Sequence, residues 1–192
     1  MRIAIFPGSF NPVHQGHVQL ALHILDTSIA DEVWMLVTPR NPLKAKSDLI
    51  DEADRLAMVR LAVADVPGLA ASDFEFRLPR PSYTIDTLRQ LEQSYPEHQF
   101  VLMIGSDNAL IFDEWKEHDE LLKRFEVYVY PRPGFPIGDA IKLYPAMKSV
   151  DTPLYPIAST QLREMLKKGI DTGGWLHAEV ARYIDRHRLY RC

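Results

Sequence analysis

Apolar residues along this chain form short, nearly unbroken runs, separated by longer stretches in which they recur every three or four positions. The short runs predict five β-strands, at 2–6, 32–38, 72–76, 99–105 and 126–130. Strands that are apolar on both faces are typical of a parallel sheet with both sides covered.

The longer stretches predict the covering helices, because their apolar residues fall on one face of a helical repeat. Asp51 is placed to cap one of these helices, and Gly169 is placed to end another. The predicted helices span 17–25, 52–65, 84–93, 113–125, 159–169 and 177–189. The segment between 131 and 158 is irregular and contains several prolines, so no element is predicted there.

Alternation of strand and helix predicts an α/β fold, with a mainly parallel sheet of five or more strands and helices on both faces. No repeat or linker interrupts the pattern, so we expect a single domain over residues 1–192. Its C-terminal part, from about residue 159, is expected to be helical.

Composition and charge exclude several classes of protein. The formal net charge is −4, which argues against nucleic-acid binding through bulk basicity. No run approaches the roughly 20 apolar residues that span a bilayer, and the opening run is too short for a signal peptide. The one cysteine, Cys192, provides neither a disulfide framework nor a thiolate metal cluster. We therefore expect a cytoplasmic protein that binds neither nucleic acid nor membranes.

The segment GSFNPVHQGH lies where the first strand should pass into the first helix. Ligands of parallel sheets bind beyond the carboxyl ends of the strands, and a helix N-terminus there suits phosphate. Gly8 permits a tight turn, Ser9 can donate its hydroxyl, and Gly16 allows the backbone to approach a ligand. His14 and His17 can direct imidazole N–H groups at one phosphate.

The two histidines have other interpretations. Each could be a surface residue, or the pair could be half of a metal site, although no cysteine or HExxH motif supplies a third ligand. Because a helix N-terminus disfavours a cation, at least one imidazole is expected to be neutral near pH 7. The residues of this segment alone leave these alternatives open.

Several short motifs along the chain resemble the signature motifs of a known enzyme family. GSFNPVHQGH resembles the first signature of the HxGH nucleotidyltransferases, and IASTQLR (157–163) resembles their second signature, ISSTxxR. Between them, NPLK, PSYTIDTL, IGSDN and YPRPG occur in the order found in bacterial nicotinate mononucleotide adenylyltransferases, and the ending YIDRHRLYR is also similar. The resemblance covers nearly the whole chain and implies a Rossmann-like nucleotidyltransferase fold.

The chain departs from the family pattern at a few positions. The first motif usually reads GGTFDPxHxGH, whereas Pro7, Ser9 and Asn11 stand here in place of glycine, threonine and aspartate. Ala158 replaces a common serine in the second motif, which removes one hydroxyl. The related pantetheine-phosphate adenylyltransferases carry threonine in place of the first histidine, so His14 argues against that family.

The resemblance implies transfer of the adenylyl group of ATP to nicotinate mononucleotide, forming deamido-NAD and pyrophosphate in NAD biosynthesis. The nucleophile is already a phosphate anion, so catalysis needs positioning and charge stabilisation rather than a general base. Mg²⁺ is expected to arrive with ATP, ligated mostly by water and phosphate, and no protein metal site is expected. Alternatives are an enzyme of the same superfamily acting on nicotinamide mononucleotide or phosphopantetheine, and a non-catalytic nucleotide-binding regulator.

The site residues implied by the resemblance fall into three groups. The expected catalytic residues are His14, His17 and Arg163, with His17 stabilising charge on the α-phosphate. The expected ATP-binding residues are Gly8, Ser9, Phe10, Gly16, Gly105, Asp107, Ser159 and Thr160. The expected mononucleotide-binding residues are Asn41, Lys44, Thr84, Ile85, Trp115 and Arg132. The helix N-terminus at Thr84 and Ile85 offers backbone N–H donors, which favour a carboxylate over an amide.

Structural interpretations compete with some of these roles. Ser159 and Thr160 would also begin an ordinary helix, and Asp107 would also serve as a helix N-cap. Trp115 would also fit a hydrophobic core, and Arg132 would also fit an exposed surface.

Overall fold

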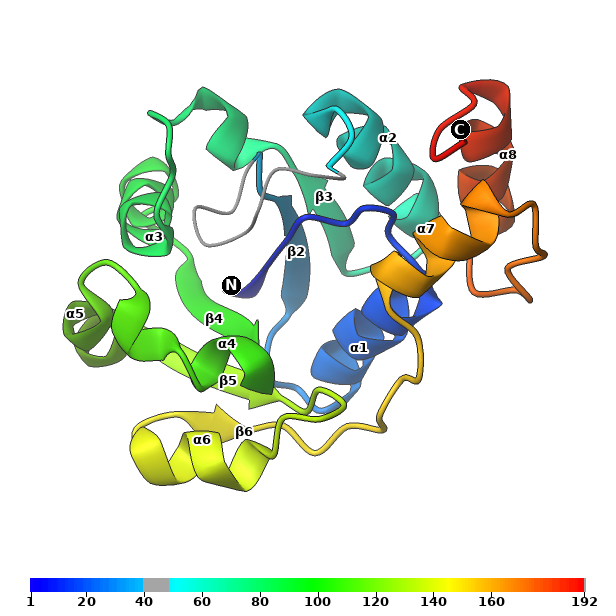
Figure 1. Ribbon diagram of the computed structural model, residues 1–192. Coiled ribbons are helices and arrows are strands. Elements are labelled where there is room, and N and C mark those ends of the chain that lie inside the picture. The colour runs from blue at the N-terminus through cyan, green and yellow to red at the C-terminus, as the bar shows by residue number, and fades with distance from the viewer. Residues whose placement is uncertain (40–48, 192) are drawn as a thin grey trace.

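The computed structural model describes residues 1–39 and 49–191, which are built around one parallel β-sheet. In the described ranges the sheet has six strands in the order β3-β2-β1-β4-β5-β6, and every pairing is parallel (Figure 1). The strands are β1 (Arg2–Gly8), β2 (Glu32–Val37), β3 (Leu69–Ser72), β4 (Gln99–Gly105), β5 (Glu126–Tyr130) and β6 (Lys148–Ser149). The predicted α/β class with a mainly parallel sheet is confirmed.

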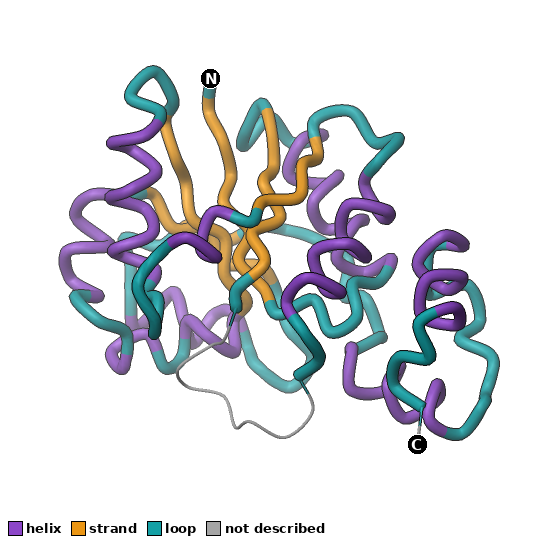
Figure 2. Tube along the Cα trace, turned by 90° about the horizontal axis from the view of Figure 1, so that it is seen from above, coloured by secondary structure: helices purple, strands orange, loops and turns teal. Residues whose placement is uncertain are grey.

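Helices lie on both sides of this sheet, as Figure 1 and the turned view in Figure 2 show. They are α1 (Gln15–Asp26), α2 (Glu52–Val63), α3 (Thr84–Ser94), α4 (Ser106–Ala109), α5 (His118–Arg124), α6 (Ile137–Leu143), α7 (Ser159–Lys167) and α8 (Ala178–Arg186). Two 3₁₀ turns, at Phe74–Arg77 and Phe112–Glu114, complete the described elements. None of the helices in the described ranges has the length and apolar character needed to cross a membrane.

Alternation along the strands divides the core into two layers. On β1, Ala4 and Phe6 belong to one apolar cluster, and Ile3 and Ile5 belong to the other. The first cluster takes in buried residues of α1, α2, α7 and α8, whereas the second takes in residues of α3, α5 and α6. Both faces of the sheet are therefore covered, which explains the unbroken apolar runs of the central strands.

Two predicted elements are wrong. The third strand was expected at 72–76, but β3 ends at Ser72, whose Oγ accepts from the backbone N–H of Phe74 and starts a 3₁₀ turn. The helix expected at 113–125 begins only at His118, because Glu117 has a left-handed backbone with φ of 52°. The structure also contains α6 and β6, for which the proline-containing segment gave no signal.

The strand order reverses between β1 and β4. From β1 the chain adds β2 and β3 on one side, and it then returns to add β4, β5 and β6 on the other. Crevices beyond the carboxyl ends of strands at such a reversal are the usual ligand sites of α/β sheets. Gly8 ends β1 and Gly105 ends β4, so the first and fourth strands deliver their following residues to this place.

Candidate active site

The loop of residues 9–14, which joins β1 to α1, is packed around an aromatic ring. Phe10 has a left-handed backbone with φ of 47°, and its ring meets Phe6 edge-on at 5.6 Å between centroids. A Cβ on Gly8 would lie 2.8 Å from the Phe10 ring. This close approach requires glycine at position 8, so the reason differs from the tight turn expected from the sequence.

His14 and His17 stack on each other at the start of α1. Their ring centroids lie 3.7 Å apart, and the backbone N–H of His14 donates to Nδ1 of His17 at 3.2 Å. Because Nδ1 accepts, the proton of a neutral His17 is on Nε2. A Cβ on Gly16 would come within 3.1 Å of the His14 ring, so Gly16 leaves room for that imidazole.

The His14 side chain is buried, and burial lowers its pKa to about 3, with a smaller contribution from the positive charge of Arg132. His14 is therefore neutral at pH 7. A neutral imidazole was expected in this pair, although its cause is burial and a nearby cation, not a helix N-terminus. In the part of the chain that the structure describes, Nδ1 of His14 has no hydrogen-bond partner.

A buried arginine on α2 holds the backbone of the β1–α1 loop in place. Arg55, on α2, is fully buried and donates to the carbonyl oxygens of Ser9 at 2.7 Å, Thr38 at 2.8 Å and Pro39 at 2.8 Å. Its Nε also donates to the carbonyl of Ile50 at 3.1 Å. Burial lowers the pKa of Arg55, but a guanidinium remains charged at neutral pH. This one side chain therefore ties together the segments that follow β1 and β2.

The second motif joins the first through α7. Ser159 Oγ donates to the carbonyl oxygen of Pro12 at 2.9 Å, and Arg163 Nη1 donates to that of Asn11 at 2.9 Å. Ala158 occupies the N-cap position, and its N–H is satisfied by Oε1 of Gln161 at 2.9 Å. Gln161 therefore satisfies the backbone N–H of the N-cap residue, although Ala158 has no hydroxyl to accept from the first turn of the helix.

The Asn11 side chain is reached from the far end of the chain. Tyr190, a few residues after α8, donates its hydroxyl to Oδ1 of Asn11 at 2.8 Å, and both residues are buried. The backbone N–H of Ile50 also points to this oxygen at 3.5 Å. The side-chain oxygen of Asn11 thus accepts a buried hydrogen bond, at the position where the usual family motif has aspartate.

Two adjacent cavities, which share several lining residues, lie beyond these strands. The larger has a volume of about 800 Å³ and the smaller about 130 Å³. Both are lined by Pro7, Gly8, Ser9, Asn108 and Tyr130. The β1–α1 loop therefore begins on the wall between the two cavities.

Most of the predicted site residues converge on these cavities. The larger cavity is lined by Gly8, Ser9, Phe10, His17, Asp107, Arg132, Ser159, Thr160 and Arg163. The smaller is lined by Gly8, Ser9, Thr84, Gly105 and Trp115. A third, minor pocket beside the larger one holds His14 and Gly16 with His17 and Arg132.

A few predicted residues lie elsewhere. Ile85 is fully buried in the core and is not among the lining residues of either cavity. Arg132 lies at the histidine end and pairs with Asp107 at 3.8 Å, outside the cavity that contains Trp115. Gly105, not Asp107, is the N-cap of α4, so the capping interpretation of Asp107 is wrong. Asn41 and Lys44 lie outside the described residues.

The smaller cavity has a buried acid on its wall that the sequence did not single out. Glu75 accepts hydrogen bonds from Thr87 Oγ1 at 2.9 Å and Ser82 Oγ at 3.3 Å, and burial raises its pKa. Trp115 lines the same cavity, and its indole Nε1 is buried with no partner in the described ranges. Thr87 and Ser82 flank the start of α3, so Glu75 helps fix the position of that helix end.

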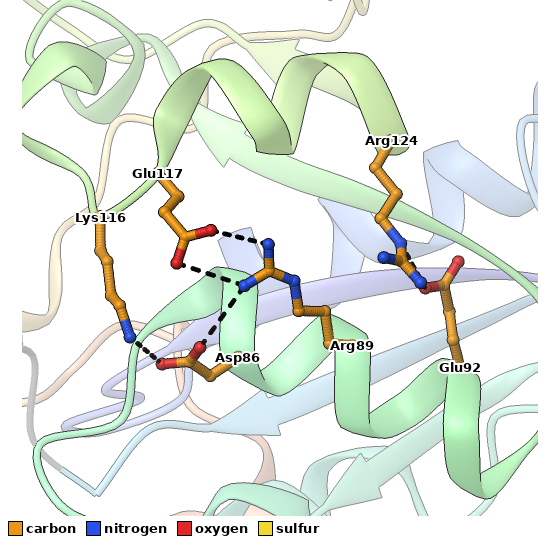
Figure 3. A network of polar contacts seen from close by, with 6 residues as sticks. All are labelled: Asp86, Arg89, Glu92, Lys116, Glu117 and Arg124. Carbon is orange, nitrogen blue, oxygen red and sulfur yellow. Dashed lines mark hydrogen bonds and ion pairs between the residues drawn. The ribbon is translucent and has the colours of Figure 1, made fainter.

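Ion pairs on the molecular surface connect α3 to the segment of residues 115–117 (Figure 3). Arg89 donates to both carboxylate oxygens of Glu117, at 3.2 and 2.7 Å, and Lys116 donates to Asp86 at 2.7 Å. These partners are exposed, and their hydrogen bonds raise the pKa of Arg89 and Lys116. The segment that carries Trp115 is thus joined to the helix that carries Thr84.

The parallel sheet reverses its strand order beside a histidine-bearing loop, an arginine-bearing helix and two adjacent cavities. This arrangement is typical of nucleotide-binding α/β proteins of the nucleotidyltransferase type. The chain belongs to the cytidylyltransferase-like family, whose model matches residues 5–165.

Individual relatives carry names that state a more specific activity than the family description does. The chain is 46% identical to a probable nicotinate-nucleotide adenylyltransferase of Bacteroides fragilis, over 95% of this chain and 90% of that protein. It is 40% identical over the full length of both chains to a probable nicotinate-nucleotide adenylyltransferase of Flavobacterium johnsoniae.

A solved structure shares the fold. Plasmodium falciparum nicotinic acid mononucleotide adenylyltransferase, complexed with NaAD, superposes with a TM-score of 0.82 at 21% identity, covering 98% of this chain and 97% of that one.

Proposed function

We propose that this chain is a nicotinate-nucleotide adenylyltransferase, which transfers the adenylyl group of ATP to nicotinate mononucleotide and releases pyrophosphate. The observation that carries the proposal is the pair of adjacent cavities that share part of their lining, with His17 on one and Trp115 on the other. Two substrates that react through their phosphates need such an arrangement, with the phosphates meeting at the shared wall. The two relatives that are 46% and 40% identical over nearly the full chain are named for the same activity, which supports the proposal.

The reaction is an in-line displacement. A 5′-phosphate oxygen of the mononucleotide forms a bond to the α-phosphorus of ATP, and the bond from that phosphorus to the bridging oxygen breaks, with both electrons leaving on pyrophosphate. His17 donates its Nε2–H to the α-phosphate as charge builds there. Arg163 uses two of its five N–H donors to hold Asn11 and Thr160, which orients the guanidinium at the larger cavity.

Mg²⁺ belongs to this proposal as part of the nucleotide substrate. In the described ranges, no group of three or more histidine, cysteine, aspartate or glutamate residues could hold a metal ion. The proposal assigns the ligands of Mg²⁺ to phosphate oxygens and water, which suits an ion that dehydrates reluctantly.

The test is pyrophosphate release with ATP and a panel of acceptors: nicotinate mononucleotide, nicotinamide mononucleotide and phosphopantetheine. The proposal expects release with nicotinate mononucleotide and a product with the mass of deamido-NAD. Release with phosphopantetheine alone would move the chain to another branch of the family. No release with any acceptor, while ATP still binds, would favour a regulator.

A further inference from the structure

The acidic side chains around the smaller cavity disfavour the binding of an anionic ligand. Its charged lining residues in the described ranges are Glu75, Glu114 and Lys116. Lys116 is therefore the one cation among the lining residues that the structure describes. A substrate carboxylate entering this cavity needs a nearby positive charge to offset the acidic residues.

Asp86 adds a further negative charge near this cavity, at the start of α3. It is the third residue of the helix, next to the backbone N–H groups that are free at its first turn. A carboxylate there stabilises the helix, but it also repels an anion that approaches the same N–H groups. Lys116 Nζ lies 2.7 Å from Asp86 Oδ2 and 5.0 Å from the centroid of the Tyr83 ring. The ammonium thus neutralises the one acidic side chain of this turn.

Neighbouring ion pairs keep Lys116 in this place. On its C-terminal side, Glu117 is held by Arg89 through two hydrogen bonds, and farther along α5 Arg124 donates to Glu92 at 2.8 Å (Figure 3). All three pairs join the same two parts of the chain, α3 and the residues from 116 to 124. Several pairs acting together hold a long side chain better than one exposed pair does.

We propose that Lys116 is a specificity-determining residue, whose ammonium, placed by Asp86, makes the smaller cavity favour an acceptor carrying a carboxylate over one carrying an amide. This rests on the proposed function. The amide is neutral, so the charge at position 116 changes the binding of the acid and leaves that of the amide nearly unchanged. Loss of one partly screened charge from the cavity wall should change the acid-to-amide ratio about tenfold.

The experiment measures kcat/KM for nicotinate mononucleotide and for nicotinamide mononucleotide, at saturating ATP, in four proteins: wild type, Lys116→Met, Asp86→Asn and the double variant. The acid-to-amide ratio should follow the net charge of the pair. Lys116→Met should have the lowest ratio, about tenfold below wild type, and Asp86→Asn the highest. The double variant should fall between the two single variants, and high salt should compress the whole series.

Two further variants separate charge from packing. Lys116→Arg keeps the charge and should hold the ratio within about threefold of wild type. Lys142→Met removes a lysine that pairs with Asp139 at 3.6 Å on α6, outside the lining of both cavities, and should leave the ratio unchanged. Melting temperatures of all variants show whether each is folded.

The outcomes are distinct. If acid and amide fall together in Lys116→Met, the residue only positions the segment that carries Trp115, and the inference is wrong. If the ratio is the same in both single variants, it is wrong as well. If the wild type uses neither mononucleotide, the proposed function itself fails, and the inference falls with it.

Discussion

The β1–α1 loop and the segment of residues 115–117 face the same pair of cavities, but different interactions hold them. The loop is held by the buried donors Arg55 on α2 and Tyr190 after α8, and by the half-buried Ser159 on α7. The segment is held from outside, by exposed ion pairs to α3. Buried hydrogen bonds resist salt and tolerate little change, whereas exposed pairs are screened and individually weak. Under the proposed function, the chemistry falls to the β1–α1 loop, here called the rigid end. Recognition of the acceptor falls to the segment of residues 115–117, here called the adjustable end.

The largest expected effect is at the rigid end. His17→Ala should lower kcat by roughly 10²–10³ and weaken ATP binding much less, as for a donor that acts mainly on the transition state. Steady-state rates and equilibrium ATP binding measure the two quantities. His23→Ala, on the same helix but outside the cavity linings, is the control. An equal loss of binding and turnover would make His17 a ground-state ligand only.

Removal of the buried guanidinium of Arg55 should lower the stability of the fold substantially. Arg55→Met leaves four backbone carbonyls without their donor, so the free energy of unfolding should fall by about 2–5 kcal/mol. Arg60→Met, on the same helix, removes an exposed pair to Asp73 and should cost less than about 1 kcal/mol. Urea unfolding compares the two variants. Similar losses would show that burial does not distinguish these arginines.

The neutral histidine should appear in the pH dependence of stability. The pKa of His14 is about 3 in the folded protein and 6.5 when unperturbed, so below about pH 6.5 only the unfolded chain binds this proton. Folding stability should therefore fall by about 1.4 kcal/mol per pH unit from this residue as the pH drops toward 3, and show no such contribution above pH 7.

His14→Asn should remove this slope, whatever its effect on stability at neutral pH. Urea unfolding at several pH values between about 6.5 and 5 measures the difference in slope. Equal slopes in the variant and the wild type would mean that His14 is protonated in the folded state.

At the adjustable end, Trp115→Ala should raise KM for the mononucleotide about tenfold and leave KM for ATP nearly unchanged, because Trp115 lines the smaller cavity, where the proposed function places only the mononucleotide. Thr84→Ala is the matched control, since the donors expected there are backbone groups that the substitution keeps. A parallel rise in both KM values would make Trp115 a packing residue of the whole site.

The elements that the sequence predicted well carry strong local signals. The apolar runs of β1, β2, β4 and β5 and the capping aspartate of α2, whose Oδ1 accepts from the Ala53 N–H at 2.8 Å, are examples. The misplaced third strand had alternating residues that fit a strand, but Glu75 is drawn inward by Thr87 and Ser82 from a later segment. That pairing is tertiary, so local periodicity does not contain it.

Motif residues of the candidate site were found because they are adjacent in sequence, and their supports were missed because they are not. Tyr190 reaches Asn11 across 179 positions, and Arg55 reaches Ser9 across 46. A signal for Arg55 did exist: it stands among apolar residues on the buried face of α2, where an arginine needs partners. The pairing of Lys116 with Asp86 has no sequence signal, because the two charges come from different elements.

The most direct measurement is a competition. With ATP, Mg²⁺ and equal concentrations of nicotinate and nicotinamide mononucleotides, the ratio of the two dinucleotide products gives the ratio of kcat/KM values. Two mismatched contacts for the amide, at about 1–3 kcal/mol each, predict that deamido-NAD exceeds NAD by at least roughly 10². Products within about threefold of each other would contradict the account of this cavity as a carboxylate-reading site.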